Sequence, residues 1–323
     1  MALSEPVTLE AIRQARERIA GVALRTPLVR LNVDEAPAEI YLKLENVQPI
    51  GAFKVRGAAS ALLATQAAEP ERLARGVWTA SAGNMAQGVA WLARRMKLPC
   101  AVVVPDHAPE AKLAALTRLG ARYVKVPFDE WFAILSARAY PGMEGLFLHP
   151  FNDAAVMAGN GTIGLEILED VPDVDAVVIP YGGGGLSSGI AAAVRALRPD
   201  ARVYACEAET AAPLVAALAA GAPQTVPYTA TFIDGMGSAS VVAEMWPLVS
   251  RLLDGSLVVT VAEIAAAMRL LVERNRVVAE GAGAAPVAAA LTGKAGGGKV
   301  VCVVSGGNID SAKLATILTG GIP

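Results

Sequence analysis

A single lysine, Lys54, lies between an aromatic residue and a glycine-containing segment in the stretch PIGAFKVRGA, residues 49–58. Lysine amines act in enzymes as nucleophiles and bases when burial lowers their pKa. The simpler interpretation is a solvated lysine on the first turn of a helix. The stretch alone does not decide between the two, so the rest of the sequence must.

Four consecutive glycines, Gly182, Gly183, Gly184 and Gly185, follow a predicted strand and precede a predicted helix. Consecutive glycines let backbone N–H groups turn inward at a helix N-terminus, which makes an anion site suited to a phosphate. A tight turn would need only one or two glycines, so four favour phosphate binding. No lysine follows in Walker spacing and no GxGxxG is present, so neither a nucleoside triphosphate nor a dinucleotide is indicated.

Two further turns carry polar residues. TASAGNMAQG, residues 79–88, places Ser81, Gly83 and Asn84 at the start of a predicted helix, and VVSGGNID, residues 303–310, follows a predicted strand with Ser305 and Asn308. Helix capping would explain either turn alone, and the first could also bind a carboxylate. Together with Lys54, three such turns indicate a ligand site where strands end and helices begin.

The elements that position these residues follow a regular order. Short β-branched runs alternate with Ala- and Leu-rich helical segments, which predicts parallel sheets with helices on both faces. The predicted strands lie within residues 39–45, 76–81, 100–105, 121–127, 145–150, 176–180, 201–207, 256–261 and 299–305.

The fold class is therefore α/β. From residue 75 to residue 150, four strand–helix units follow one another without a glycine-rich turn. We expect residues 75–150 to form a small domain inserted into a larger domain made of residues 1–74 and 151–323.

Composition limits the function classes. Hydrophobic residues make up 54% and charged residues 18% of the 323 residues, with 28 basic and 30 acidic side chains, so the chain is compact and carries no footprint for nucleic acid or membrane. The charged N-terminus is unlike a signal peptide, and a cytoplasmic protein is expected. Cys100, Cys206 and Cys302 lie in apolar runs and are interpreted as buried free thiols.

In order, KLENVQPIGAFKVRGA, TASAGNMAQG, GNGTIGLEIL, PYGGGGLSSG and VVSGGNID resemble the serine/threonine dehydratase and serine racemase family of pyridoxal 5'-phosphate (PLP) enzymes. The resemblance runs from about Thr26 to the end of the chain. It implies the two-domain PLP fold type II, like the tryptophan synthase β-subunit, with a mostly parallel twisted sheet in each domain. It also implies a homodimer.

The resemblance assigns roles to individual positions. It implies that Lys54 is the catalytic residue and forms the Schiff base with PLP, that Phe53 packs beside the ring, and that Asn84 contacts the ring 3-oxygen. Ser305 would face the pyridine nitrogen. The phosphate would be held by Gly182, Gly183, Gly184, Gly185 and Leu186, and the substrate carboxylate by Ser81, Ala82, Gly83, Asn84 and Met85.

Several positions depart from the family pattern. Ala52 replaces a frequent serine and Met85 a frequent histidine, which affects contacts to the substrate side chain. Racemases of the family have a serine acid/base at the position of Ala82, and alanine cannot exchange protons, so dehydration is favoured over racemisation.

The resemblance also bears on regulation and metal binding. Family members that bind a divalent cation use a glutamate, a carbonyl and an aspartate; Glu207 is present, but Pro213 occupies the aspartate position, so no metal is expected. Because the sequence ends at LTGGIP, we expect no C-terminal regulatory domain like that of biosynthetic threonine dehydratases and no feedback control by an amino acid.

Trp131 and Phe132 fall near the position where a serine racemase has an arginine that helps close the site. They are either core residues of an amphipathic helix or an apolar wall for a substituent such as that of phenylserine. We expect a dehydratase that converts a β-hydroxy amino acid to a 2-oxo acid and ammonia. The alternatives are a racemase or β-replacement enzyme of the same fold, or a catalytically silent PLP- or amino-acid-binding protein.

Overall fold

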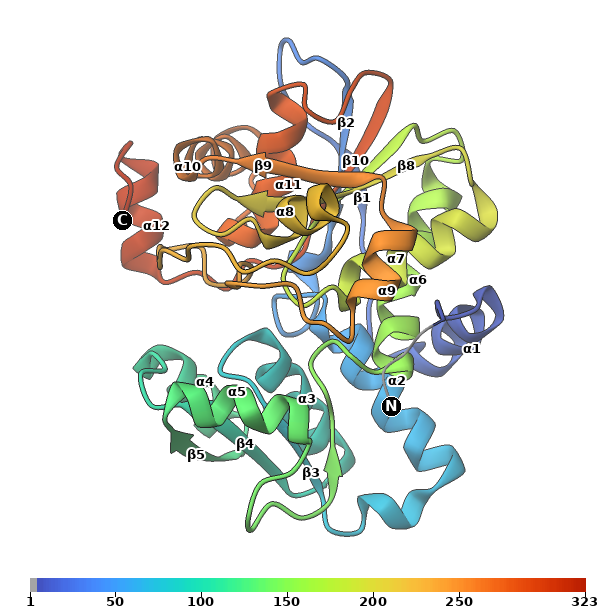
Figure 1. The fold of residues 1–323 in the computed structure, drawn as a ribbon, viewed down its shortest axis with the longest axis vertical. Helices are drawn as coiled ribbons and strands as arrows, with labels where there is room; N and C mark the ends of the chain where they lie inside the picture. The colour runs from blue at the N-terminus through green and yellow to red at the C-terminus, as the bar shows by residue number, and fades with distance from the viewer. Residues whose placement is uncertain (1–4) are drawn as a thin grey trace.

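The computed structural model describes residues 5–323, and the first four residues of the expected large domain lie outside this range. The chain folds into two β-sheets, each covered by helices (Figure 1). In Figure 1 the smaller sheet lies below with α3, α4 and α5, and the larger sheet lies above. The α/β fold class is confirmed.

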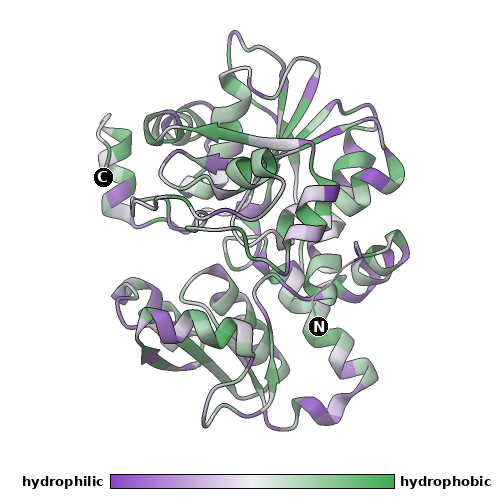
Figure 2. Cartoon of the chain, viewed as in Figure 1, coloured by the Kyte–Doolittle hydropathy of each residue, from purple (hydrophilic) through white to green (hydrophobic). Residues whose placement is uncertain are grey.

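The larger sheet has six strands in the order β1, β2, β10, β7, β8, β9. Their bounds are Leu28–Arg30, Glu39–Leu44, Lys299–Val304, Ala176–Pro180, Arg202–Ala208 and Gly255–Val259. Only β1 is antiparallel to its neighbour; the other pairs are parallel. Helices on both faces bury these strands, which explains the continuous apolar runs that Figure 2 shows along them.

The smaller sheet has four parallel strands in the order β5, β4, β3, β6. Their bounds are Arg122–Val126, Cys100–Pro105, Val77–Ala80 and Leu146–Phe147. They are joined by α3 (Asn84–Met96), α4 (Glu110–Arg118) and α5 (Phe128–Ala137). The fourth expected strand–helix unit has no helix on this sheet, because the chain after β6 enters α6 (Ala154–Asp170), which packs against α2 and α7 of the larger unit.

The remaining helices cover the larger sheet or pack on the helices that do. They are α1 (Leu9–Ile19), α2 (Lys54–Ala68), α7 (Gly185–Leu197), α8 (Pro213–Ala220), α9 (Trp246–Leu252), α10 (Val261–Leu270), α11 (Gly281–Leu291) and α12 (Ser311–Leu318). Short 3-10 turns occupy Glu45–Val47 and Pro70–Leu73, and a π turn occupies Leu271–Asn275.

Every predicted strand is present, and only β1 was missed, because a partly exposed edge strand of three residues leaves little periodic signal. Cys206 and Cys302 are buried free thiols as expected, whereas Cys100 is partly exposed. Among residues 5–323, no helix combines the length and apolar character that crossing a membrane requires.

Candidate active site

A cavity of about 840 Å³ lies between the two sheets, at the carboxyl ends of β3, β7 and β10. Parallel strands bring their carboxyl ends to one edge, which is why motifs far apart in the sequence meet here. The predicted residues that line the cavity are Phe53, Lys54, Ser81, Ala82, Gly83, Asn84, Met85, Trp131, Gly182, Gly183, Gly184, Gly185, Leu186 and Ser305. Phe132 is not among the lining residues and is 50% exposed.

Lys54 is the first residue of α2, so its place on the first turn is as the simpler interpretation expected, but its amine is buried and not solvated. Its Nζ donates a hydrogen bond of 2.7 Å to the carbonyl oxygen of Pro150 and lies 5.0 Å from the centre of the Phe53 ring. Burial lowers the pKa of Lys54 to about 8. A substantial fraction of this amine is therefore neutral near physiological pH and able to accept a proton or attack a carbonyl.

In the four-glycine turn, three of the positions require glycine, two for lack of space and one for its backbone conformation. A Cβ at Gly183 would lie 2.3 Å from the Phe151 ring, and one at Gly185 would lie 2.6 Å from the Phe151 carbonyl oxygen. Gly184 has a φ of +85°. Only Gly182 has space for a side chain, its nearest neighbour being 3.8 Å away. The turn opens α7, whose N–H groups and positive dipole end face the cavity and suit a phosphate.

The turn before α3 is open toward the cavity. The N–H of Gly83 donates to the Ser81 hydroxyl at 3.2 Å, and no atom lies within 4 Å of a Cβ placed at Gly83. Met85 is 1% exposed and belongs to the hydrophobic core around α2, α3 and β6. The Met85 side chain is therefore mainly a core residue.

Trp131 packs on the core of the smaller sheet, as one of the two interpretations expected, and it also reaches the cavity. There it stacks on Phe128 with ring centres 5.7 Å apart. Phe128 lines the same cavity and was not predicted.

Two polar residues of the site were also missed. Glu280 accepts a hydrogen bond of 2.8 Å from the Asn84 side-chain nitrogen, and Asn308, noted in the sequence but given no role, donates one of 2.9 Å to the Asn84 oxygen. Glu280 precedes the apolar helix α11, so its sequence context suggested at most a helix cap.

These residues fit PLP. The glycine turn with the α7 N-terminus would hold the phosphate, Lys54 would bind the aldehyde, and Ser305, 2% exposed at the end of β10, would face the pyridine nitrogen. When bound, PLP supplies an electron sink for bond breaking at the substrate Cα. Lys54 would hold and release the proton at Nζ.

Glu207, which the family resemblance aligns with a metal ligand, accepts hydrogen bonds from groups of this chain. The donors are the N–H groups of Leu214 (2.8 Å) and Val215 (2.9 Å) and the Ser256 hydroxyl (2.6 Å). Within the described residues, no group of three or more His, Cys, Asp and Glu side chains could hold a metal ion. The carboxylate therefore acts as an N-terminal cap for α8.

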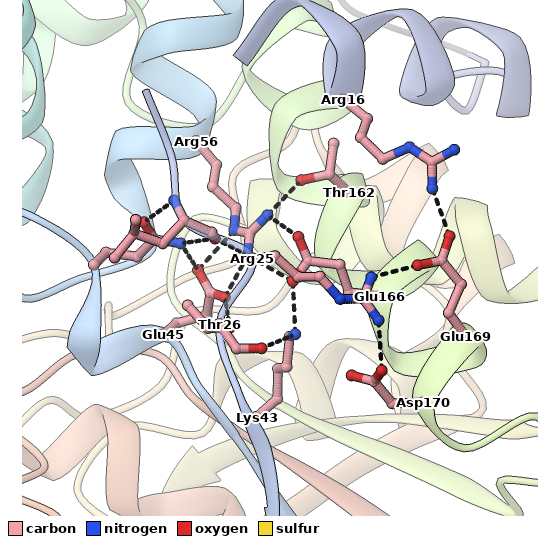
Figure 3. Close-up of polar contacts among 12 residues, drawn as sticks. Arg16, Arg25, Thr26, Lys43, Glu45, Arg56, Thr162, Glu166, Glu169 and Asp170 are labelled. Atoms are coloured by element: carbon pink, nitrogen blue, oxygen red, sulfur yellow. Dashed lines mark hydrogen bonds and ion pairs between the residues drawn. The ribbon is translucent and has the colours of Figure 1, made fainter. Parts of the chain in front are cut away.

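A buried charge cluster lies behind the first turn of α2 (Figure 3). Arg56, 1% exposed, donates to both oxygens of Glu45 and both oxygens of Glu166 at 2.6–2.9 Å. Lys43 pairs with Glu166 at 2.6 Å. The two positive and two negative charges balance, so the cluster ties α2 to β2 and α6 only two residues from Lys54.

Comparisons with known proteins agree with this site. Residues 19–306 match the family model described as pyridoxal-phosphate dependent enzyme. The chain is 41% identical to an L-threonine ammonia-lyase of Thermotoga maritima over 98% of this chain and 79% of that protein. It is 38% identical to a catabolic L-threonine dehydratase of Escherichia coli over 97% and 96% of the two chains.

Among solved structures, maize serine racemase is similar with a TM-score of 0.88 and 32% identity, covering 98% of both chains. The processed form of threonine deaminase isoform 2 from Solanum lycopersicum is similar with a TM-score of 0.83 and 31% identity, covering 98% of this chain and 90% of that chain. The chain therefore belongs to the serine/threonine dehydratase and serine racemase family of PLP enzymes with fold type II, and it is a PLP-dependent ammonia-lyase.

Proposed function

We propose that this ammonia-lyase removes water from a β-hydroxy amino acid of the threonine or serine type. The substrate loses its Cα proton to Lys54 and its Cβ hydroxyl leaves, which together release one water. Hydrolysis of the resulting free imine consumes one water and gives a 2-oxo acid and ammonia. The names of the threonine ammonia-lyase and dehydratase relatives support this substrate class.

We choose elimination over racemisation because the cavity wall has a base, Lys54, but only an inert side chain at Ala82. Lys54 supplies a buried amine with a pKa of about 8, and Ala82 lines the same cavity without any group that exchanges protons. Racemisation needs a second acid/base to return a proton from the other side. A serine racemase is among the similar solved structures, so racemisation is the alternative activity. The lack of an acid/base group at Ala82 argues against racemisation here.

Chiral chromatography of the L-serine left after partial turnover tests this choice. We expect 2-oxo acid and ammonia in equal amounts and only the L-enantiomer in the remaining substrate. In Ala82→Ser, we expect the D-enantiomer to rise from a negligible level. A substantial D-enantiomer content with the unchanged protein would show that the enzyme racemises.

For the finer substrate preference, we propose that the Phe128–Trp131 wall admits a bulky β-substituent, as in phenylserine. An apolar substituent buried against these rings gains about 25 cal/mol per Å² of area removed from water, and a small substrate gains little of this. A difference of about 2 kcal/mol in the transition state corresponds to roughly a thirtyfold preference.

The test is the ratio of kcat/KM for phenylserine to kcat/KM for L-threonine. We expect Trp131→Ala to lower this ratio about tenfold, which corresponds to about 1.4 kcal/mol of lost contact. Phe132→Ala is the matched control, because Phe132 lies outside the cavity wall and is half exposed. If L-threonine is preferred tenfold or more and both variants leave the ratio unchanged, Trp131 is only a core residue.

We propose a cytoplasmic homodimer whose domains are residues 75–150 and residues 1–74 with 151–323. Family resemblance and the separate four-stranded sheet support these proposals.

A further inference from the structure

Glu280 is a buried carboxyl group at the cavity wall that has no part in the proposed reaction. It is 5% exposed and precedes α11, and its N–H donates to the Gly306 carbonyl oxygen at 3.0 Å. A Cβ at Gly306 would lie 2.5 Å from Glu280 Oε1, and a Cβ at Gly235 would lie 3.2 Å from it. The glycines at these two positions leave just enough room for the carboxyl group, which is therefore fixed in place.

The Asn84 side-chain amide is held at both ends. Its nitrogen donates to Glu280 at 2.8 Å, and its oxygen accepts from Asn308 at 2.9 Å, while the Asn308 nitrogen also donates to the Ile50 carbonyl oxygen at 2.8 Å. A flipped amide would place its oxygen against the carboxylate and its nitrogen against the Asn308 nitrogen, and both contacts are unfavourable. An amide nitrogen has two N–H groups, so one remains available to a ligand in the cavity.

We propose that Glu280 is a positioning residue that, together with Asn308, fixes the Asn84 amide as a hydrogen-bond donor toward the ring 3-oxygen of PLP. This inference rests on the proposed function, since it takes the cavity as the PLP site. A donor at that oxygen favours its ionised form, which changes the visible absorption of the bound cofactor. A protonated Glu280 could instead donate to Asn84, which would remove the constraint on the amide.

The charges around Glu280 make its proton sensitive to pH. Burial and then the Asp234 carboxylate raise the pKa of Glu280, while Asn84 and Lys112 lower it, and together they set it at about 7. Asp234, in the segment between α8 and α9, pairs with Lys112 of α4 at 2.6 Å across the cavity mouth. Lys54, Asp310 and Lys313 line the same cavity.

Two substitutions at this ion pair should move the Glu280 titration in opposite directions. Asp234→Asn removes a negative charge and leaves Lys112 unpaired, so the pKa of Glu280 falls. Lys112→Met removes the positive charge and leaves Asp234 uncompensated, so the pKa rises. The side chains of Asp234 and Lys112 are 40% and 25% exposed, so we expect both variants to fold correctly.

The experiment is a titration of the visible absorption of the PLP-loaded protein between pH 6 and pH 9, without substrate. We expect an inflection near pH 7 that is lost in the isosteric variant Glu280→Gln. We also expect the midpoint to move down by at least about 0.3 pH unit in Asp234→Asn and up by a similar amount in Lys112→Met.

An inflection that persists in Glu280→Gln, or that neither ion-pair variant moves, overturns the positioning role of Glu280 while the proposed function stands. If the unchanged protein develops no visible absorption with PLP, the proposed function fails, and this inference fails with it.

Discussion

The amine of Lys54 is buried, so water cannot solvate its charge. The Nζ has a carbonyl partner, Pro150, and an aromatic face, Phe53, but burial dominates and lowers the pKa to about 8. At pH 7, about 9% of such an amine is neutral, against about 0.04% for a lysine with a pKa of about 10.4. Burial therefore prepares Lys54 for proton transfer.

Competitive labelling of the PLP-free protein with an amine-reactive reagent tests this shift. We expect half-maximal reactivity of Lys54 near pH 8, with the exposed Lys97 in the same digest as a reference for the reagent. Mass spectrometry of the peptides gives both profiles. Half-maximal labelling of Lys54 above about pH 10 would contradict the lowered pKa.

The individual residues differ in how far the sequence could predict them. Lys54, Ser81 and Ser305 stand in local motifs, so their place at the cavity was predicted. Glu280 and Asp234 are isolated acids in ordinary segments, and only the tertiary fold around one cavity brings Glu280 to Asn84 and Asp234 to Glu280. Such contacts between distant segments leave no local pattern in a single sequence.

The N-terminus of α7 is the element that suits the phosphate. Its glycine turn combines a left-handed residue, Gly184, with close packing of Gly183 and Gly185 against Phe151. Substitutions at these three positions would disturb the turn whatever they do to the cofactor. Gly182 lines the cavity and has room for a side chain, so it allows a cleaner test.

We expect Gly182→Asp to weaken PLP binding at least tenfold, which corresponds to about 1.4 kcal/mol, because a carboxylate would face the phosphate. Gly182→Ala is the matched control, with a smaller loss. Fluorescence titration of the PLP-free variants with PLP gives both dissociation constants. Equal affinity in the Asp variant and the unchanged protein would show that the phosphate lies elsewhere.

The helix α2 is held by the charge cluster around Arg56. Burial raises the pKa of Glu45, but Arg56, Thr26 and Lys43 lower it more, so the carboxyl stays ionised in the interior. Removing one partner of a buried pair leaves the others uncompensated. The cluster therefore couples the stability of the fold to the position of Lys54.

We expect Arg56→Met to lower the free energy of unfolding by about 3–5 kcal/mol, because Glu45 and Glu166 would lose their buried partner. Arg72→Met is the control; its ion pair with Glu69 is 51% and 53% exposed, and we expect a change within about 0.5 kcal/mol. Urea unfolding measures both. A change below about 1 kcal/mol in Arg56→Met would mean that the cluster does not stabilise α2.

In the whole molecule, the two sheets share one cavity because the strands that lead into it are parallel. The alternating pattern predicted parallel sheets, and parallel sheets place their loops at one edge. The sequence did not predict that α6 leaves the smaller sheet to pack against α2 and α7, because helical periodicity shows an apolar face without showing its partner. The sequence also could not predict the ion pair between Lys112 and Asp234 across the cavity mouth, because only the tertiary structure brings these distant residues together.

The central claim is that this cavity, with Lys54 in it, is the active site of an ammonia-lyase for β-hydroxy amino acids. The most direct measurement is the release of 2-oxo acid and ammonia by the PLP-loaded protein and by Lys54→Ala, with L-threonine, L-serine and phenylserine. We predict equal amounts of both products from at least one substrate, and none from Lys54→Ala, which should still bind PLP non-covalently. Absence of product with all three substrates, or turnover by Lys54→Ala at the rate of the unchanged protein, would contradict the account.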